Sequence, residues 1–270
     1  MRSYKYREHE YALKVLGSGF QTSHYGRELR LAATYLREVF GMDRAAIRRR
    51  LCDLCQKYLR DYNEARHYSV INYAVREAMK PDARLISISE IPIYEGELLY
   101  IDSLPVSRGS KKVMLAMLVS RKLSKAVYER KRDDGTPYTN MCFGGGRAKY
   151  TELKKMSCIP QSTDIHTAVI AELAGKKLVN ILHNGLISLD WIYNTAETGE
   201  LMLSITDFAN TGLYYDRYKG DTNIKECSVC GGLYRLRTNN QRYCCADCAT
   251  EADLEKARQR SRMRRMKNVG

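Results

Sequence analysis

The sequence predicts a mainly α-helical protein of the α+β class, with few strands and a cysteine-rich module near its end. Three observations support this fold class. Apolar side chains recur at helical spacing through much of residues 1–80 and 107–175. Two short apolar runs flank the pair Asn184-Gly185, and two close cysteine pairs lie between Cys227 and Cys248. The expected parts of the chain are residues 1–80, 81–106, 107–220 and 221–270.

Residues 1–80 are expected to form an N-terminal helical bundle. Gly41 ends one apolar pattern, and Asp43 is a natural N-cap for the next. Pro81 stops a third pattern, because proline cannot continue a helix. The three amphipathic helices are expected over residues 27–40, 44–62 and 64–79. Residues 81–106 are then a linker or a lead-in, with a short strand predicted near residues 85–89.

One of these predicted helices carries two features that could be functional. Cys52 and Cys55 form a Cys-x2-Cys pair, but no second pair lies near them in the sequence. Buried thiols on an amphipathic helix are therefore the favoured interpretation. The arginine run at residues 48–50 could contact phosphate, although a solvated helix face is the favoured interpretation there.

The middle of the chain predicts three helices followed by a hairpin. The helices are expected over residues 107–128, 147–156 and 162–175, with Ser162 as the N-cap of the third. The pair Asn184-Gly185 between apolar runs is the strongest short-range hairpin signal. The two predicted strands cover residues 178–182 and 186–192. This order of elements resembles a winged helix-turn-helix, in pattern only.

The resemblance implies a helix over residues 162–175 that is offered to the major groove of DNA. None of its expected outward residues is basic. A winged helix that contacts only protein is therefore the alternative interpretation. The residues that the resemblance places at the nucleic acid are Thr163, Thr167, Lys176, Lys177, His183 and Asn184.

The most specific signal is the set of cysteines between residues 227 and 248. Cys227 and Cys230 form a Cys-x2-Cys pair, and a second pair ends at Cys248. Two close thiol pairs on a short polar loop are typical of one structural zinc ion. Either Cys244 or Cys245 could be the third ligand, because adjacent cysteines cannot both face one ion comfortably. Four thiolates leave no open position for water, which argues against a catalytic zinc.

The string RYCCADC at residues 242–248 resembles the pattern Arg/Lys-Tyr-Cys-Ser-x-x-Cys of small zinc fingers. Such fingers occur in phage and bacterial mobile-element proteins, and their first cysteine after the tyrosine is the ligand. The resemblance therefore implies the ligand set Cys227, Cys230, Cys244 and Cys248, with Cys245 in the usual serine position. It defines no function by itself.

A basic helix is predicted directly after the cysteines. Residues 256–267 hold seven basic side chains and no acid, and no broad apolar face separates them. Such a segment gains little from packing on a core. It is either a solvated tail or a phosphate-binding arm whose direction the metal module fixes. The basic residues are Lys256, Arg258, Arg260, Arg262, Arg264, Arg265 and Lys267.

Composition limits the classes of partner. The 270 residues include 45 lysines and arginines against 31 acids, a net charge of +14, which favours a polyanion such as nucleic acid. Nine cysteines, several at metal spacing, predict a reducing compartment. The sequence shows no secretory signal and no apolar run long enough for a membrane span, so we expect a cytoplasmic protein.

Enzyme motifs are weak in this sequence. The glycine run at residues 144–146 lacks the order of a phosphate-binding loop, and no zinc-protease or serine-hydrolase signature appears. We therefore expect a DNA-binding, non-enzymatic protein of a phage or mobile element, either a transcriptional regulator or a replication accessory factor. The first alternative is an adaptor or inhibitor that binds a polymerase or nuclease. The second is a metal-dependent nuclease assembled from scattered acids.

Overall fold

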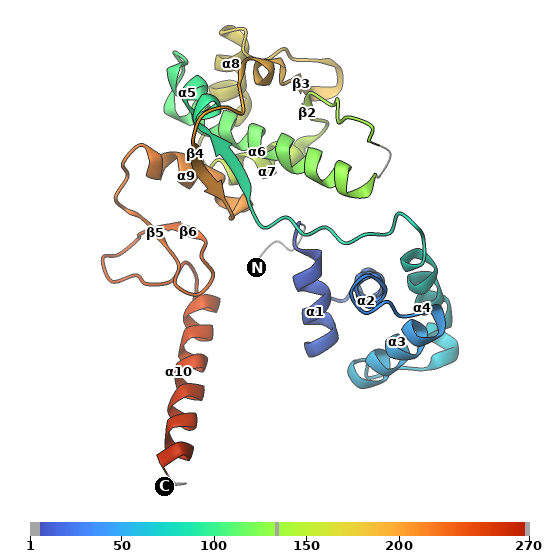
Figure 1. Cartoon of the computed structure of the whole chain (residues 1–270). Coiled ribbons are helices and arrows are strands. Elements are labelled where there is room, and N and C mark those ends of the chain that lie inside the picture. Colours follow the sequence, from blue (N-terminus) through green and yellow to red (C-terminus); the bar gives the residue numbers. More distant parts are fainter. Residues whose placement is uncertain (1–5, 133–134, 268–270) are drawn as a thin grey trace. The chain divides into compact units, whose positions relative to one another are not determined.

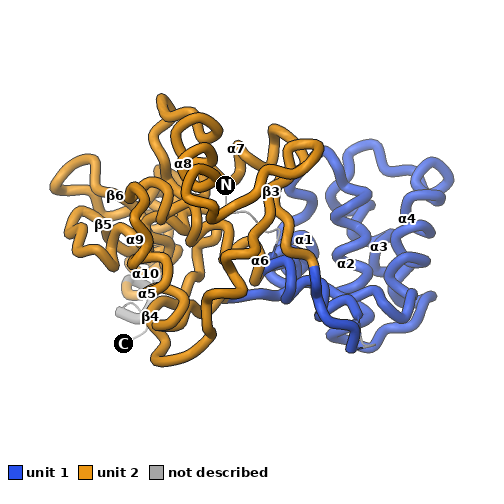
Figure 2. The backbone as a smooth tube through the Cα atoms, turned by 90° about the horizontal axis from the view of Figure 1, so that it is seen from above, with its two compact units in different colours: residues 1–89, 123–139 blue, residues 90–122, 140–270 orange. Residues whose placement is uncertain are grey.

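The computed structural model describes residues 6–132 and 135–267, with only the backbone of residue 262 and residues 264–267. Its described part is mainly helical, with ten α-helices and three two-stranded antiparallel sheets (Figure 1). The predicted α+β class with a helical majority is confirmed. The chain divides into two compact units, which Figure 2 distinguishes. The first contains residues 1–89 and 123–139, and the second contains residues 90–122 and 140–270.

The helices of the first unit begin and end largely where the local sequence predicts. Gly41 ends one helix with a left-handed φ of 62°. The Asp43 side chain accepts a 2.7 Å hydrogen bond from the Ala46 amide, and Asn63 caps the next helix through the Arg66 amide. The helices are α1 (Glu8–Ser18), α2 (Tyr25–Phe40), α3 (Arg44–Tyr58) and α4 (Glu64–Ala78). The predicted extension of α3 to residue 62 is wrong, because its C-cap Leu59 has extended dihedral angles.

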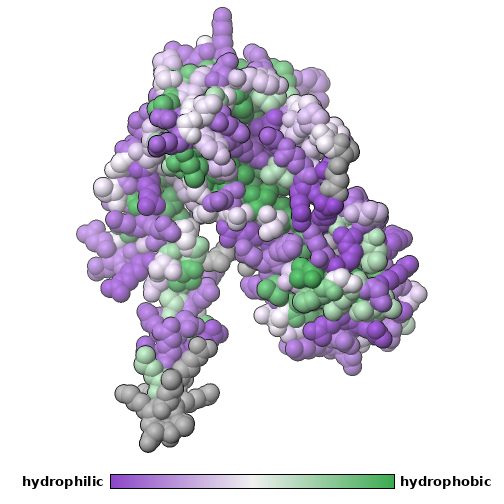
Figure 3. Space-filling view, in the orientation of Figure 1, coloured by the Kyte–Doolittle hydropathy of each residue, from purple (hydrophilic) through white to green (hydrophobic). Residues whose placement is uncertain are grey.

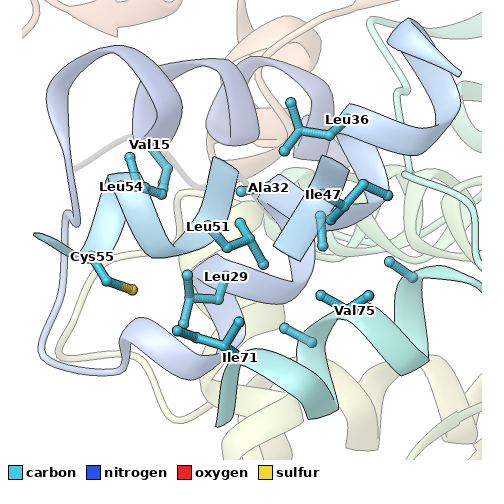
Figure 4. Packing of buried hydrophobic residues seen from close by; sticks show 13 residues of the cluster. Val15, Leu29, Ala32, Leu36, Ile47, Leu51, Leu54, Cys55, Ile71 and Val75 are labelled. Atoms are coloured by element: carbon cyan, nitrogen blue, oxygen red, sulfur yellow. The ribbon is translucent and has the colours of Figure 1, made fainter. Parts of the chain in front are cut away.

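One apolar cluster joins these four helices (Figure 4). Leu29 from α2, Leu51 from α3 and Ile71 from α4 are almost completely buried in it. Cys55 also lies in this core, where burial raises the pKa of its thiol to about 12. Cys52 packs against the same cluster. The Cys-x2-Cys pair of α3 is therefore part of the packing, as we expected from its place on the helix.

The second unit is built around a buried helix. Helix α6 (Arg108–Lys131) starts in this unit, and its residues 113–119 have at most 1% of their surface exposed. A segment that is apolar on every side must be covered by other elements. One neighbouring helix is α5 (Glu95–Ser103), whose Glu97 carboxylate lies 2.7 Å from the Lys122 ammonium group of α6.

The predicted lead-in at residues 81–106 contains regular structure that periodicity did not indicate. Strand β1 (Ile91–Tyr94) pairs antiparallel with β4 (Leu201–Ile205). Proline is tolerated at Pro92 because a two-stranded sheet has only edge strands. The strand predicted near residues 85–89 is reduced to one bridge between Ser87 and Arg7.

The predicted hairpin of residues 178–182 and 186–192 is wrong in its extent. A turn does form at Asn184-Gly185, both with positive φ, but a single bridge joins Ile181 to Ile187. Strand β3 (Leu186–Ser188) pairs instead with β2 (Cys142–Gly144), which lies between two of the predicted helices. Residues 190–194 then form a 3-10 helix, in which Trp191 is buried.

The helix predicted over residues 162–175 begins later than expected. Ser162 is not its N-cap; a carboxylate oxygen of Asp164 accepts from the His166 amide at 2.9 Å. A π-helical turn (His166–Ile170) leads into α8 (Ala171–Gly175). Glu172 of α8 accepts a 2.8 Å hydrogen bond from the Ser107 amide at the start of α6. The preceding helix α7 (Arg147–Met156) has the predicted bounds.

Candidate metal centre

A short hairpin presents the first cysteine pair. Strands β5 (Ile224–Glu226) and β6 (Leu233–Arg235) are antiparallel, and the turn between them contains Cys227 and Cys230. The Gly231 amide donates to the Cys227 carbonyl at 2.8 Å, and the Cys227 amide donates to the Gly232 carbonyl at 3.0 Å. Gly231 has a φ of 68°, a left-handed conformation that glycine adopts without strain. The glycine after the pair therefore lets the chain close tightly around the sulfurs.

The second pair lies at the start of the last helix, α10 (Ala246–Lys267). Cys244 precedes α10 and Cys248 lies in its first turn, so the helix itself orients one sulfur. The Cys230 and Cys244 sulfurs are 3.5 Å apart, and so are those of Cys244 and Cys248. All four Sγ atoms, including that of Cys227, lie within 4.8 Å of one another.

These distances suit a tetrahedral ion. Zinc–sulfur bonds of about 2.3 Å place the sulfurs of a tetrahedron about 3.8 Å apart. The four sulfurs lie within about 1 Å of that spacing. Cys227 and Cys248 are buried and the other two are half-buried. The arrangement can therefore hold one metal ion with four thiolates.

Cys245 lies beside this group and not in it. Its side chain is exposed, and its sulfur is 3.7 Å from the Cys244 sulfur. The group of four that could hold an ion contains Cys244. The sequence left both Cys244 and Cys245 open as the third ligand. The structure places Cys244, and not Cys245, with the other three cysteines.

The electrostatics of the cluster favour a thiolate at Cys227. Burial acts to raise the pKa of this thiol, but backbone N–H groups of Cys244, Cys230 and Val229 donate to the sulfur and lower it to about 6. Burial raises the pKa of Cys248 to about 12. Because metal ligands must be deprotonated, an ion is needed to ionise the full set. The local backbone is already arranged for one negative sulfur.

A polar side chain that sequence reasoning missed stabilises the loop between the two pairs. The side-chain oxygen of Gln241 accepts a hydrogen bond from the Arg237 main-chain amide at 2.9 Å. Its side-chain nitrogen donates to the Tyr243 carbonyl at 2.9 Å. The Tyr234 hydroxyl donates to the Gln241 main-chain carbonyl at 3.0 Å. Tyr234 and Tyr243 also pack against the cysteines. A single glutamine in a loop has no characteristic sequence pattern, so only the contacts in the structure show that Gln241 stabilises this loop.

An ion-pair network ties the cysteine module to the rest of the second unit. Arg235 on β6 lies 2.8 Å from the carboxylate of Asp216 on α9 (Thr211–Tyr218). Asp216 is 3% exposed and also lies 2.7 Å from the Lys112 ammonium group and 2.8 Å from Arg108. No sequence pattern indicates this network, because its members are far apart along the chain.

Helix α10 presents its described basic side chains to solvent. The described side chains of residues 253–261 are all exposed, and Figure 3 shows a mostly hydrophilic surface there. Lys256 lies 3.3 Å from Asp253, and Arg258 lies 3.6 Å from Glu255, both exposed pairs within one turn. Such pairs are weak and leave the cations accessible. Arg260 is exposed, whereas the side chains of Arg262, Arg264, Arg265 and Lys267 lie outside the described residues.

The remaining predicted nucleic-acid residues lie before, within and after the helix at residues 165–175. Thr167 is exposed, and Thr163 is half-buried in the loop before the helix. Lys176, Lys177, His183 and Asn184 are all exposed. They belong to the same unit as the cysteine module but to different elements.

Comparisons with protein families, with curated proteins and with solved structures find no match for this chain. Among the described residues, every helix falls short of the length or apolar character needed to cross a bilayer. The site is therefore interpreted from its own chemistry.

Proposed function

We propose that this protein binds nucleic acid, with duplex DNA as its target, through a zinc-bound cysteine module that aims the basic helix α10. The observation that supports this most directly is the position of Cys248. It belongs to the group of four cysteines and lies in the first turn of α10. An ion held there would fix the start of a helix whose described basic side chains are exposed.

The same module would attach helix α10 rigidly to the rest of the second unit. Arg235, through Asp216, connects the cysteine hairpin to α9 and to the buried helix α6. A phosphate-binding arm on a fixed base loses less conformational freedom on binding than a free tail does. We infer that zinc supplies order and that the arginines and lysines of α10 supply affinity.

A winged helix-turn-helix in the middle of the second unit would add orientation. The order of α6, β2, α7, the helix at residues 165–175, the bridge at Ile181 and β3 supports this proposal. Helix 165–175 would then enter the major groove, with Thr167 on its exposed side. Lys176 and Lys177 would contact the backbone, and His183 with Asn184 would form the tip of the wing. Phosphate contacts would position the protein, and the helix would read bases.

The test is fluorescence anisotropy of the full chain with duplex DNA, single-stranded DNA and RNA over a salt series. Each phosphate contact contributes about −0.9 to the log–log salt slope for duplex DNA. Replacing Lys256, Arg258 and Arg260 with glutamine should therefore flatten the slope by about 2 to 3. Replacing Lys57, Arg60 and Lys125 of the first unit, which are exposed and lie outside α10 and the winged-helix region, with glutamine gives a control of equal charge. Equal slopes for the α10 variant and the unmodified protein would refute the role of the arm.

A protein-binding role for the winged-helix region is the second candidate. Ile181 is 64% exposed and Leu182 is 40% exposed, close to the turn at His183. Exposed apolar side chains suit a protein surface better than a phosphate backbone. An adaptor of this kind would capture its partner after nuclease treatment, whereas nucleic-acid binding by α10 would be lost.

A further inference from the structure

A second basic surface lies in the first unit, on a different element from the cysteine module. A groove of about 590 Å³ runs between α3 and α4. Its lining includes three arginines and two tyrosines and no acidic residue. The lining residues are Arg44, Ala45, Arg48, Tyr68, Ser69, Asn72, Tyr73 and Arg76.

The α4 side of this groove is a single helix face. Its residues recur at spacings of three and four, which places them side by side on the helix. The core of the unit takes another face of α4, through Ile71, Ala74 and Val75. The groove residues are therefore not needed to bury the helix. On α3, Arg44 and Arg48 are one turn apart and supply the opposite wall.

The tyrosines and arginines of the groove lie against one another. The Arg48 guanidinium carbon is 5.0 Å from the centre of the Tyr68 ring, and that of Arg76 is 5.3 Å from the Tyr73 ring. Tyr68 remains 52% exposed and Tyr73 47% exposed, so both rings keep surface for a ligand. A ring with a cation over one face can stack a base on its other face, while the cation contacts the adjacent phosphate.

Acids near the groove do not neutralise it. Arg48 lies 3.1 Å from Glu64, whose side chain is 65% exposed, and Arg76 lies 3.7 Å from Glu77. The Arg48–Glu64 pair is exposed and therefore weak, and the half-buried Glu77 lies closer to Lys80, at 2.7 Å, than to Arg76. Phosphate oxygens can compete for the same guanidinium groups, because arginine forms bidentate hydrogen bonds with phosphate.

We propose that the α3–α4 groove binds single-stranded nucleic acid, with bases stacked on Tyr68 and Tyr73 and phosphates on Arg44, Arg48 and Arg76. Duplex DNA keeps its bases stacked on one another and offers the tyrosines no ring face, so the combination favours a single strand. Ser69 and Asn72 add hydrogen-bonding groups without a fixed sequence preference. This site is independent of the function proposed for the cysteine module and α10.

The first test measures the affinity of the full chain for oligothymidylate and oligouridylate. Replacing Tyr68 and Tyr73 together with alanine should weaken single-strand binding at least about tenfold, because base–aromatic stacking is lost. The matched variant with phenylalanine at both positions keeps the rings and should bind within about twofold of the unmodified protein. Duplex affinity should be unchanged in both variants, since duplex contacts are assigned to the second unit. The two oligonucleotides distinguish DNA from RNA as the preferred strand.

A second measurement needs no variant and so does not depend on how the alanine protein folds. An oligonucleotide carrying 5-iodouracil is crosslinked by light to the unmodified protein, and the crosslinked peptides are identified by mass spectrometry. Crosslinks at Tyr68 or Tyr73 support the groove. Crosslinks confined to residues 221–267, or equal single-strand affinity of the alanine and phenylalanine variants, would overturn it. If the unmodified protein crosslinks at Tyr68 or Tyr73 but does not bind duplex DNA, the result counts against the role proposed for α10 and not against the groove.

Discussion

The Arg235 guanidinium group lies 2.8 Å from the Asp216 carboxylate and connects the cysteine hairpin to helix α9. Its other terminal nitrogen lies 2.5 Å from Asp221, which the same arginine holds at a pKa below its usual range. Asp216 is buried, and Lys112 beside it is only 8% exposed. The Asp216 carboxylate thus contacts three cations, Arg108 and Lys112 of α6 and Arg235 of β6.

Removing Asp216 should destabilise the second unit strongly. In Asp216→Ala the buried Lys112 loses its carboxylate, and breaking a buried pair in this way costs about 3–5 kcal/mol. Arg235→Ala leaves Lys112 paired and should cost about 1 kcal/mol or less. Urea unfolding followed by circular dichroism measures both values. Equal losses in the two variants would mean that the network is not organised around Asp216.

Metal binding should depend on Cys248 and not on Cys245. We expect Cys248→Ser to lose most of the bound zinc and to lower duplex affinity, because the same residue lies in the first turn of α10. Cys245→Ser changes an exposed thiol outside the group of four and serves as the matched control. Inductively coupled plasma mass spectrometry of purified protein should give one zinc ion per chain for the unmodified protein and for the control. A full zinc content in Cys248→Ser would contradict the proposed ligand set.

The stability of the second unit should fall in acid partly through Asp102. The Tyr215 hydroxyl donates to this carboxylate at 2.7 Å and Lys219 lies 3.0 Å away, and together they hold its pKa below the usual range against the effect of burial. A lowered folded-state pKa stabilises the protein above the unfolded value of about 3.9, and the contribution disappears as pH falls through the folded value.

The free energy of unfolding, measured between pH 2 and 6, checks this sign. Asp102→Asn should be less stable than the unmodified protein near pH 6, and the difference should shrink towards pH 2. Tyr215→Phe removes the main donor and should reduce the same pH dependence. A constant difference across the range would show that the carboxylate charge at residue 102 is not what stabilises the fold.

Gly212 should tolerate no side chain. A Cβ atom at this position would lie 2.0 Å from the Ser157 carbonyl oxygen, so α9 and the end of α7 approach each other at backbone distance. We expect Gly212→Ala to lower the melting temperature by more than 10 °C, consistent with a loss of several kcal/mol. Gly175→Ala is the control, because it lies in a helix with no atom within 4 Å of the added carbon. That variant should be slightly stabilised, by about 0.5–1 kcal/mol. Similar melting temperatures in the two variants would contradict the close approach.

Local signals predicted the elements that depend on neighbours in sequence. The bounds of α7, the Asp43 cap and the Gly41 terminus follow from side chains within one or two turns of one another. Cysteine spacing likewise predicted that Cys227 and Cys230 face one point, because they need only a tight turn, but it left Cys244 and Cys245 open as the third ligand. These features could be derived without knowing where the remainder of the chain goes.

By itself, the sequence determined the helical majority, the excess of positive charge and the two cysteine pairs. Only the tertiary structure decided that β3 pairs with β2, that β1 pairs with β4, and that Asp216 contacts three cations. It also placed Arg44 and Arg48 opposite two tyrosines of α4, which a run of arginines on one helix could not indicate. The reason is physical: such contacts join distant segments, and the whole fold, not the local pattern, offsets the entropy of bringing them together.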